Sequence, residues 1–362
     1  MTDRIEQLQR AMSIRGVGVC AIGPSENLRY LLGYDGVALE RLTVLLVSQS
    51  GAAMIMPDFE AAEFAAVDGR PPVVEWSDRD GPAAAVEAAF AGLGAIGGDA
   101  LVDDELPFGY FARVRDRLPS QPLPASALLG DLRLRKSAEE LEAIAGAGEL
   151  VSRGIDLAQE IAEPGMSEKQ LKRRIEELMW DGGAASVDFV LVQAGANSAN
   201  GHHAADDTAL RAGEPVLFDI AVRVGDYFAD TTQQVYLGEP PDEYRDHYEL
   251  VARAQEAGVR AAVPGATAHD VASAASAPIV DAGLQEFTGP RTGHGIGIGV
   301  HEAPSVIEGD RTELVDGMVI TVEPGVYFPG RYGIRIEDTV AITSDGPRRL
   351  TRGARALAAR QV

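Results

Sequence analysis

The stretch Leu217–Gly238, LFDIAVRVGDYFADTTQQVYLG, reads as a β-hairpin, because apolar and β-branched residues alternate with others on both sides of a Val224-Gly225 centre. If those two residues form the turn, Asp219 lies opposite Asp230. Residues directly opposite in an antiparallel pair share one face, with Cβ atoms about 5 Å apart. Two carboxylates this close repel each other, so the pairing predicts a proton or a cation between them.

Composition and charge narrow the kinds of protein to consider. The chain has 362 residues, of which 46% are apolar and 24% charged, as in globular proteins of two domains. The net charge of −23 argues against nucleic acid and against an anionic membrane as partners. No run approaches the ~20 apolar residues of a membrane helix. The charged N-terminus lacks the apolar core of a secretory signal, and Cys20 is the one cysteine, so we expect a reducing, cytoplasmic location.

The order of predicted elements divides the chain into a smaller α/β part and a larger α+β part. Three prolines within 118–130 indicate a linker, so we expect an N-terminal domain over residues 1–125 and a catalytic domain over 126–362. The larger part contains two pairs of helices, each followed by strands, which suggests a weak internal repeat. Its helices are predicted at 136–162, 167–183, 243–263 and 268–283.

Four further stretches carry residues suited to metal chemistry. They are GANSANGHHAADD (195–207), TGHGIGIGVHEAP (292–304), VITVEPGVYF (319–328) and GIRIEDTVAIT (333–343). Together with the hairpin they supply the carboxylates of Asp219, Asp230, Glu323 and Glu337 and the imidazole of His294.

Four carboxylates cannot be buried together without compensation, whereas two divalent cations would neutralise them. Two bridged ions about 3.5–4 Å apart are a recurring hydrolytic device. Oxygen ligands with one imidazole suit manganese, cobalt or iron, and zinc also fits. We expect manganese first.

These motifs resemble the metal-dependent "pita-bread" peptidases, a family that includes methionine aminopeptidase, aminopeptidase P and prolidase. The segments GHGIGIGVHEAP, VEPGVY and GIRIEDT match it in order and spacing, and LRLRKSAEELEAI resembles the opening of its catalytic domain. The segment NLRYLLGYDG, followed by ERLTVLLV, is similar to the creatinase-type N-terminal domain of the prolidase and aminopeptidase P branch. The resemblance therefore implies a pita-bread α+β domain after a creatinase-type α/β domain.

The resemblance also implies a ligand set. Asp219 corresponds to a ligand of one metal, and Asp230 and Glu337 correspond to bridging ligands. His294 and Glu323 correspond to ligands of the other metal.

Four residues correspond to catalytic groups of the family. Glu323 resembles the proton shuttle, which accepts a proton from the nucleophilic water. His202 matches the histidine that contacts the scissile amide, and His301 matches the one that steadies the oxyanion. Arg335 is expected to hold a carboxylate beside the metals. The neighbouring His203 and Glu302 are expected to be structural.

The implied reaction is hydrolysis of an Xaa-Pro bond, in dipeptides or at the N-terminus of short peptides, by a metal-bridging hydroxide. A homodimer is expected from the same resemblance. Some dipeptidases of the family have an arginine just after the HExP motif that grips the substrate carboxylate, but this chain has Ser305 there. Arg291 and Arg311 are candidate substitutes, and the choice between dipeptidase and aminopeptidase stays open. Gln233 and Ala221 also depart from the family pattern around the hairpin.

Two other functions compete with the peptidase. One is hydrolysis of a small non-peptide amide on the same fold, of the ectoine type; creatine-type relatives work without metal and lack the ligand set. The other is a non-catalytic binding module, which the intact set of five ligands disfavours.

Overall fold

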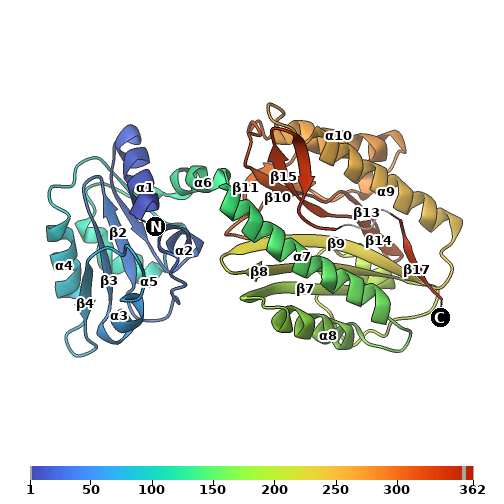
Figure 1. Cartoon of the computed structure of the whole chain (residues 1–362), viewed down its shortest axis with the longest axis horizontal. Helices are drawn as coiled ribbons and strands as arrows, with labels where there is room; N and C mark the ends of the chain where they lie inside the picture. The colour runs from blue at the N-terminus through green and yellow to red at the C-terminus, as the bar shows by residue number, and fades with distance from the viewer. Residues whose placement is uncertain (1, 353–355, 362) are drawn as a thin grey trace. The chain divides into compact units, whose positions relative to one another are not determined.

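The computed structural model describes residues 2–352 and 356–361, and the chain divides into two compact units between Arg133 and Leu134. The first unit is a sheet with helices, and the second combines several sheets with the long helices α7–α10 (Figure 1). The expected order of an α/β part followed by an α+β part is confirmed. The division lies beyond residue 125 because helix α6 is tied to the first unit, where the Tyr30 hydroxyl donates to the carbonyl of Leu132.

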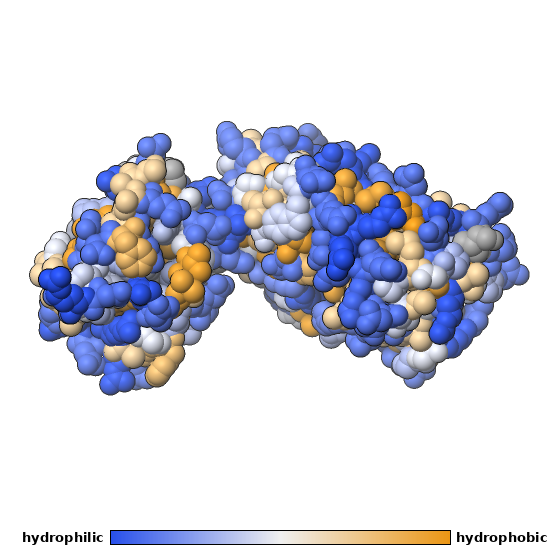
Figure 2. Space-filling view, turned by 90° about the horizontal axis from the view of Figure 1, so that it is seen from below, coloured by the Kyte–Doolittle hydropathy of each residue, from blue (hydrophilic) through white to orange (hydrophobic). Residues whose placement is uncertain are grey.

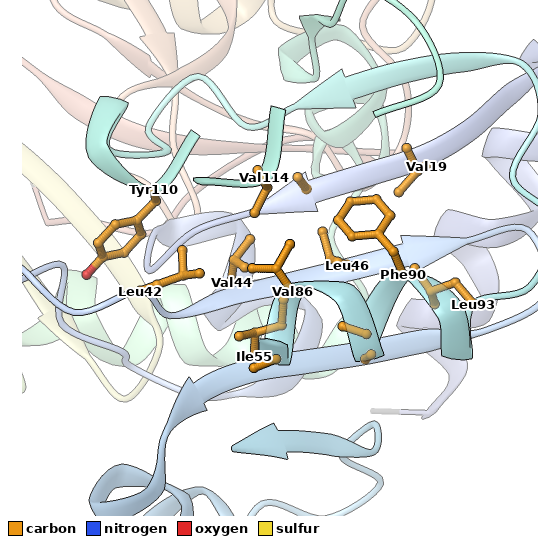
Figure 3. Close-up of a cluster of buried hydrophobic side chains, with 14 of the residues drawn as sticks. Val19, Leu42, Val44, Leu46, Ile55, Val86, Phe90, Leu93, Tyr110 and Val114 are labelled. Atoms are coloured by element: carbon orange, nitrogen blue, oxygen red, sulfur yellow. The ribbon is translucent and has the colours of Figure 1, made fainter. Parts of the chain in front are cut away.

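The first unit is built on a mixed six-stranded sheet of order β4-β3-β2-β1-β5-β6. Inward-facing residues of its central strands alternate along the chain and form one core cluster, to which α4 contributes Val86 and Phe90, and Leu93 directly after the helix also packs there (Figure 3). The elements are α1 Thr2–Arg15, β1 Val17–Ile22, α2 Glu26–Leu32, β2 Val44–Ser48, β3 Ala52–Pro57, α3 Asp58–Phe64, β4 Val73–Trp76, α4 Ala83–Gly92, β5 Asp99–Val102, α5 Phe108–Val114, η1 Arg115–Arg117, β6 Leu123–Pro124 and α6 Ser126–Leu134.

The prediction that 118–130 is a linker is wrong in part. Strand β6 and the start of α6 lie within it, and β6 pairs with β5 in parallel. Proline removes a hydrogen-bond donor, but β6 is an edge strand, where the missing donor breaks no ladder. Proline-rich composition therefore did not exclude regular structure here.

The second unit has two main sheets and a hairpin. Strands β17-β9-β8-β7 form one sheet, β11-β10-β12-β15-β16 form the other, and β13 pairs with β14. Helix α7 packs on β8 and β9, and α9 packs on α10 (Figure 1). The elements are α7 Ala138–Ile161, α8 Glu168–Asp181, β7 Ser186–Ala194, η2 Gly195–Ala199, β8 Pro215–Val224, β9 Tyr227–Leu237, α9 Asp242–Ala261, α10 Ala268–Asp281, η3 Gln285–Phe287, β10 Gly293–Gly295, β11 Glu302–Val306, β12 Val319–Val322, β13 Gly325–Phe328, β14 Tyr332–Arg335, β15 Asp338–Thr343, β16 Gly346–Arg349 and β17 Ala358–Arg360.

The two helix pairs use the same connection, as the suggested repeat requires. The backbone N–H of Gly165 donates to the carbonyl of Leu210, and that of Gly265 donates to the carbonyl of Leu314. Each glycine is followed two residues later by a serine or threonine that begins the next helix with a capping box. In each pair, the chain just before the second helix is therefore hydrogen-bonded to the segment that leads into a later strand, β8 in the first pair and β12 in the second.

The hairpin turn lies one residue later than predicted. Val224 pairs with Tyr227, so the central residues are Gly225 and Asp226 instead of Val224 and Gly225. Gly225 has φ 58°, a conformation that valine would adopt only with strain. The glycine therefore takes the first central position of the turn, and this fixes the register.

As a result the two aspartates are diagonal neighbours and not direct partners. Asp219 pairs with Thr232, and Asp230 pairs with Ala221. The predicted direct opposition is wrong by two residues. Side chains alternate with a period of two, so both carboxylates still lie on the same face.

Figure 2 shows a surface that is mainly hydrophilic, with hydrophobic residues in separate patches. Among the described residues, no helix is long and apolar enough to cross a membrane.

Gly148 and Gly146 of α7 form a matched pair for a stability test. A Cβ at position 148 would lie 2.0 Å from the carbonyl oxygen of Leu350, whereas one at 146 would meet no atom within 4 Å. We expect Gly148→Ala to lower the unfolding temperature through this clash. Gly146→Ala should stabilise the protein by about 0.5–1 kcal/mol, because alanine loses less entropy in a helix. Calorimetric melting of both variants checks the opposite signs.

Candidate metal centre

All eight residues predicted for the site line one cavity of about 850 Å³. Each sheet of the second unit contributes: Asp219 comes from β8 and Asp230 from the neighbouring β9, while His294 comes from β10. The others are Glu323 just after β12, Arg335 at the end of β14, Glu337 just before β15, His202 after η2, and His301 between β10 and β11. The residues predicted from motifs far apart in the sequence therefore meet in one cavity.

The acids at the centre are almost completely buried. Asp219, Asp230 and Glu337 are 8%, 3% and 1% exposed. One oxygen of each, Oδ1 of the aspartates and Oε1 of the glutamate, is buried and has no hydrogen-bond partner among the described residues. An anionic oxygen left this way is strongly unfavourable unless a cation binds it. The donor set thus fits divalent metal ions.

His294 is prepared to act as a ligand through Nε2. Its Nδ1 lies 2.9 Å from the carbonyl oxygen of Gly295, which can only accept, so Nδ1 carries the proton. Nε2 is 3.5 Å from Glu323 Oε1 and 4.0 Å from Asp230 Oδ2. Burial, and then the neighbouring His301, lower the pKa of His294 to about 3, so the imidazole is neutral at physiological pH.

The atoms that could bind one ion are close together. Ligand atoms of Asp230, His294 and Glu337 all lie within 4.8 Å of one another. Burial first, and then the other acids of the centre, raise the pKa of Asp230 and of Glu337 well above their usual values. Burial likewise raises the pKa of Glu323 to about 7. Without a metal, these acids therefore retain protons.

Arg335 neutralises one acid and connects it to a second. Its Nη2 donates to Asp219 Oδ2 at 2.6 Å, and its Nη1 donates to the Tyr327 hydroxyl at 3.0 Å. Its Nε donates to the Thr232 hydroxyl at 3.1 Å, and that hydroxyl donates to Glu337 Oε2 at 2.6 Å. One oxygen of each of the two acids is thereby held, and the other is left for a cation.

Sequence reasoning missed Thr232 and Tyr327. Thr232 lies two residues after Asp230 on the same strand, and the period of two signals that it shares the face of that aspartate. Tyr327 lies within the VEPGVY motif, but nothing in its spacing indicates a contact with Arg335.

The two histidines that the resemblance assigns to catalysis, His202 and His301, occupy different parts of the wall. The rings of His301 and His294 are 4.3 Å apart between centroids and nearly perpendicular, at 69°. Burial, and then the positive charge of Arg291, lower the pKa of His301, which favours its neutral form. His202 is exposed on the loop after η2.

Glu168, at the start of α8, fixes the loop that carries His202. Its carboxylate is fully buried and accepts from Ala194 N at 2.7 Å, Asn197 Nδ2 at 2.9 Å and Asp206 N at 3.0 Å. His203 Nε2 lies 2.9 Å from the same carboxylate. The group Glu168, His203 and Asp206 could also be considered for a metal, but both glutamate oxygens already have partners. Sequence reasoning missed Glu168, which lies 34 residues before His202.

A second buried pair supports His301. Lys136 Nζ lies 2.6 Å from Glu302 Oε1, and the two side chains are 3% and 8% exposed. Breaking such a pair would leave a buried charge, so Glu302 is held firmly beside His301. This contact agrees with the structural role expected for Glu302.

Two family models cover most of the chain. The model of metallopeptidase family M24 matches residues 142–344, and the creatinase/prolidase N-terminal domain matches residues 4–135. The chain belongs to metallopeptidase family M24.

Individual members of family M24 are similar over almost the whole length. A probable dipeptidase PepE of Mycobacterium tuberculosis is 36% identical over 348 residues, covering 95% of this chain and 92% of that protein. An Xaa-Pro dipeptidase of Pyrococcus horikoshii is 30% identical over 359 residues, 99% of each chain. The crystal structure of a prolidase from Thermococcus sibiricus matches with a TM-score of 0.93 and 34% identity, covering 99% of this chain and 98% of that one. The predicted fold class is confirmed.

Asp230→Asn tests whether the buried acids need a cation. After chelation the variant should melt above the chelated wild type, because asparagine is uncharged in the folded state without taking up a proton, and it should gain less from added Mn²⁺. Burial and the other acids raise the folded pKa of Asp230, so the folded state binds a proton more tightly than the unfolded state. Chelated wild type therefore loses stability as pH rises above the unfolded value of about 3.9, and the advantage of the variant should grow with pH above that value.

Calorimetry with and without Mn²⁺ measures both effects. Saturation at one hundred times Kd should stabilise the wild type by about 2.7 kcal/mol. An equal gain in both proteins would place ion binding elsewhere.

Glu168→Ala should loosen the loop around His202, because four hydrogen-bonding contacts lose their common partner. Hydrogen exchange of the segment 195–206 should become faster by at least about tenfold, while exchange in β8 and β9 stays slow. Glu177→Ala, an exposed position on the same helix, is the control and should leave the segment unchanged. Unaltered exchange in Glu168→Ala would contradict the loop-fixing role.

Proposed function

We propose that this protein is a peptidase that hydrolyses the Xaa-Pro bond of dipeptides or at the N-terminus of short peptides. One observation carries the proposal: buried acids and the imidazole of His294 line the same cavity as several apolar side chains. The names of the relatives, Xaa-Pro dipeptidase and prolidase, support this substrate class. They give no support to the ectoine-type alternative.

The ligand set fits two divalent ions, for which we propose manganese. Asp219 would bind one ion, His294 and Glu323 the other, and Asp230 and Glu337 would bridge them. The unpartnered oxygens of Asp219, Asp230 and Glu337 support this assignment. When bound, such ions lower the pKa of a coordinated water and polarise the scissile carbonyl.

The protein's own residues then move protons and hold the substrate. Burial raises the pKa of Glu323 to about 7, which suits a group that takes up and returns a proton at neutral pH. A proline nitrogen must receive a proton when it leaves, and we assign that delivery to Glu323. Neutral His301 can donate a hydrogen bond to the carbonyl oxygen as charge develops on it. His202 is assigned to the scissile amide, and Arg335 holds Asp219 in place.

Apolar residues on the cavity wall suit the proline ring. Phe189, Leu191, Pro290 and Tyr327 line the space around the acids. A pyrrolidine ring buried against such surfaces leaves water, which favours binding by roughly 25 cal/mol per Å². Because the substrate's tertiary amide has no N–H, the wall needs no acceptor at that point.

The remaining assignments are also proposals. We propose a cytoplasmic homodimer, in line with the single cysteine and the family resemblance. The substrate is a short proline-containing peptide, and nucleic acid and membranes are not partners of a chain with a net charge of −23.

Purified protein with Mn²⁺ should release the N-terminal alanine from Ala-Pro or Ala-Pro-Ala and act poorly on Ala-Ala. His294→Ala removes one ligand and should lower kcat/KM by at least about a thousandfold, together with the bound metal content. His269→Asn, a histidine outside the cavity, should retain activity. Amino-acid release and metal analysis measure the two effects. The proposal is rejected if the metal-loaded wild type neither cleaves nor binds either proline peptide.

A further inference from the structure

The imidazole of His301 is placed by its backbone and not by bonds of its own. Its ring contacts that of His294, and in the part of the chain that the structure describes it forms no hydrogen bond or ion pair. His301 ends the loop 296–301, which leaves β10 and enters β11, where Gly295 pairs with Glu302. The position of the imidazole therefore depends on what fixes this loop.

The carboxylate of Glu302 fixes the loop from inside. Its Oε1 lies 2.6 Å from Lys136 Nζ, and its Oε2 accepts from the backbone N–H of Gly299 at 3.4 Å. Gly297 lies directly against the ion pair, because a Cβ there would be 2.5 Å from Glu302 Oε1 and 2.8 Å from Lys136 Cε. The backbone of the loop is thus folded closely around one buried pair of charges.

The start of helix α7 holds the same loop by two routes. Lys136 lies two residues before the helix, and Glu140 lies in its first turn. The Tyr227 hydroxyl donates to the Glu140 carboxylate, and the backbone N–H of the next residue, Phe228, donates to the carbonyl of Gly297 at 2.7 Å. One route is the ion pair itself, and the other runs through the β8–β9 hairpin.

A buried ion pair of this kind is better suited to orienting a group than to stabilising the fold. Taking two charges out of water offsets most of their attraction, so an apolar pair of similar volume would give similar stability. An apolar pair has no preferred direction, whereas a charge-assisted hydrogen bond fixes the carboxylate and the backbone that carries it.

We propose that Lys136 is a positioning residue of the reaction: through Glu302 it sets the place of the His301 imidazole. The inference rests on the proposed function, in which His301 donates to the carbonyl oxygen, and it identifies what holds that donor. Neither Lys136 nor Glu302 lines the cavity, so both act through the histidine.

This role predicts where a loss appears in the kinetics. Charge develops on the carbonyl oxygen only as the bond is attacked, so a displaced donor weakens the transition state more than the bound substrate. A misplacement of about 1 Å can cost about 100-fold in rate. The effect should therefore appear in kcat, while KM and the bound metal content change little.

The test is a double-mutant cycle on hydrolysis of Ala-Pro by Mn²⁺-loaded wild type, Lys136→Met, His301→Ala and the double variant. Lys136→Met should lower kcat about 10- to 100-fold, with KM and metal content within about twofold. Adding it to His301→Ala should cost less than about twofold more, because the donor is already gone. Lys172→Met, a half-buried lysine paired with Glu176 on α8, is the control and should keep the wild-type kcat.

Two further variants guard against a loss of folding. Lys136→Met leaves the Glu302 carboxylate buried without its cation, so Lys136→Met/Glu302→Gln, which removes both charges, takes its place in the cycle if the single variant does not fold. Gly297→Ala displaces the Glu302 carboxylate without removing a charge and should also lower kcat at unchanged metal content.

Histidine-selective NMR gives a readout that is independent of turnover. The chain has six histidines, so their ring signals can be assigned by single substitutions. In Zn²⁺-loaded protein, which is diamagnetic, Lys136→Met should shift or broaden the signal of His301. The signals of His247 and His269, which do not line the cavity, should stay unchanged.

The outcomes separate this inference from the proposed function. If wild type cleaves Ala-Pro, but the loss from Lys136→Met adds fully to that from His301→Ala or appears in KM or metal content, the positioning role is overturned and the peptidase stands. If wild type cleaves no proline peptide, the proposed reaction fails, and a signal change at His301 without changes at His247 and His269 still supports the placement by Lys136. An unchanged His301 signal overturns the inference in either case.

Discussion

The structure of the second unit depends on burying four carboxylates beside one imidazole. Asp219, Asp230, Glu323 and Glu337 share one cavity, and burial raises the pKa of the last three. The protein compensates only part of this charge, since Arg335 pairs with Asp219 and Thr232 donates to Glu337. The rest requires protons or cations, because unpaired buried charge is very unfavourable. The protein's own groups therefore leave part of the buried negative charge uncompensated. Bound metal ions would stabilise the fold as well as take part in its chemistry.

Close backbone approach brings the imidazole to the acids. Strand β10 runs between β11 and β12, where a Cβ at Gly293 would lie 2.1 Å from the carbonyl oxygen of Thr321 and one at Gly295 would lie 2.0 Å from that of Ala303. Any larger residue at either position would push the strands apart. His294, between these glycines, therefore reaches Glu323 only because its neighbours have no side chains. The glycine-rich motif is thus a packing requirement of the metal centre.

Sequence reasoning located the residues that short motifs carry, and missed those that only tertiary contacts define. The hairpin, its two aspartates and the helices α7–α10 follow from periodicity and capping signals, which are local. The turn was predicted one residue too early, because alternation alone does not say which residue takes the left-handed conformation. In the structure Gly225 takes it. Glu168 was missed because it acts through backbone amides far along the chain. No spacing rule encodes that kind of contact.

The two cavity arginines show why position decides the role of a residue type. Both carry the same guanidinium, and from the sequence Arg335 is expected beside a metal-binding carboxylate, whereas Arg291 is one of two candidates for contact with the substrate. Arg335 ends strand β14 and forms an ion pair with Asp219, so its charge is used within the protein. Arg291 precedes β10 in an exposed segment, so its charge remains available to what enters the cavity. A buried ion pair fixes the orientation of an acid, whereas a guanidinium on the cavity wall has no such fixed partner among the described residues. The same charged group therefore supports the metal centre in one place and faces the open cavity in the other.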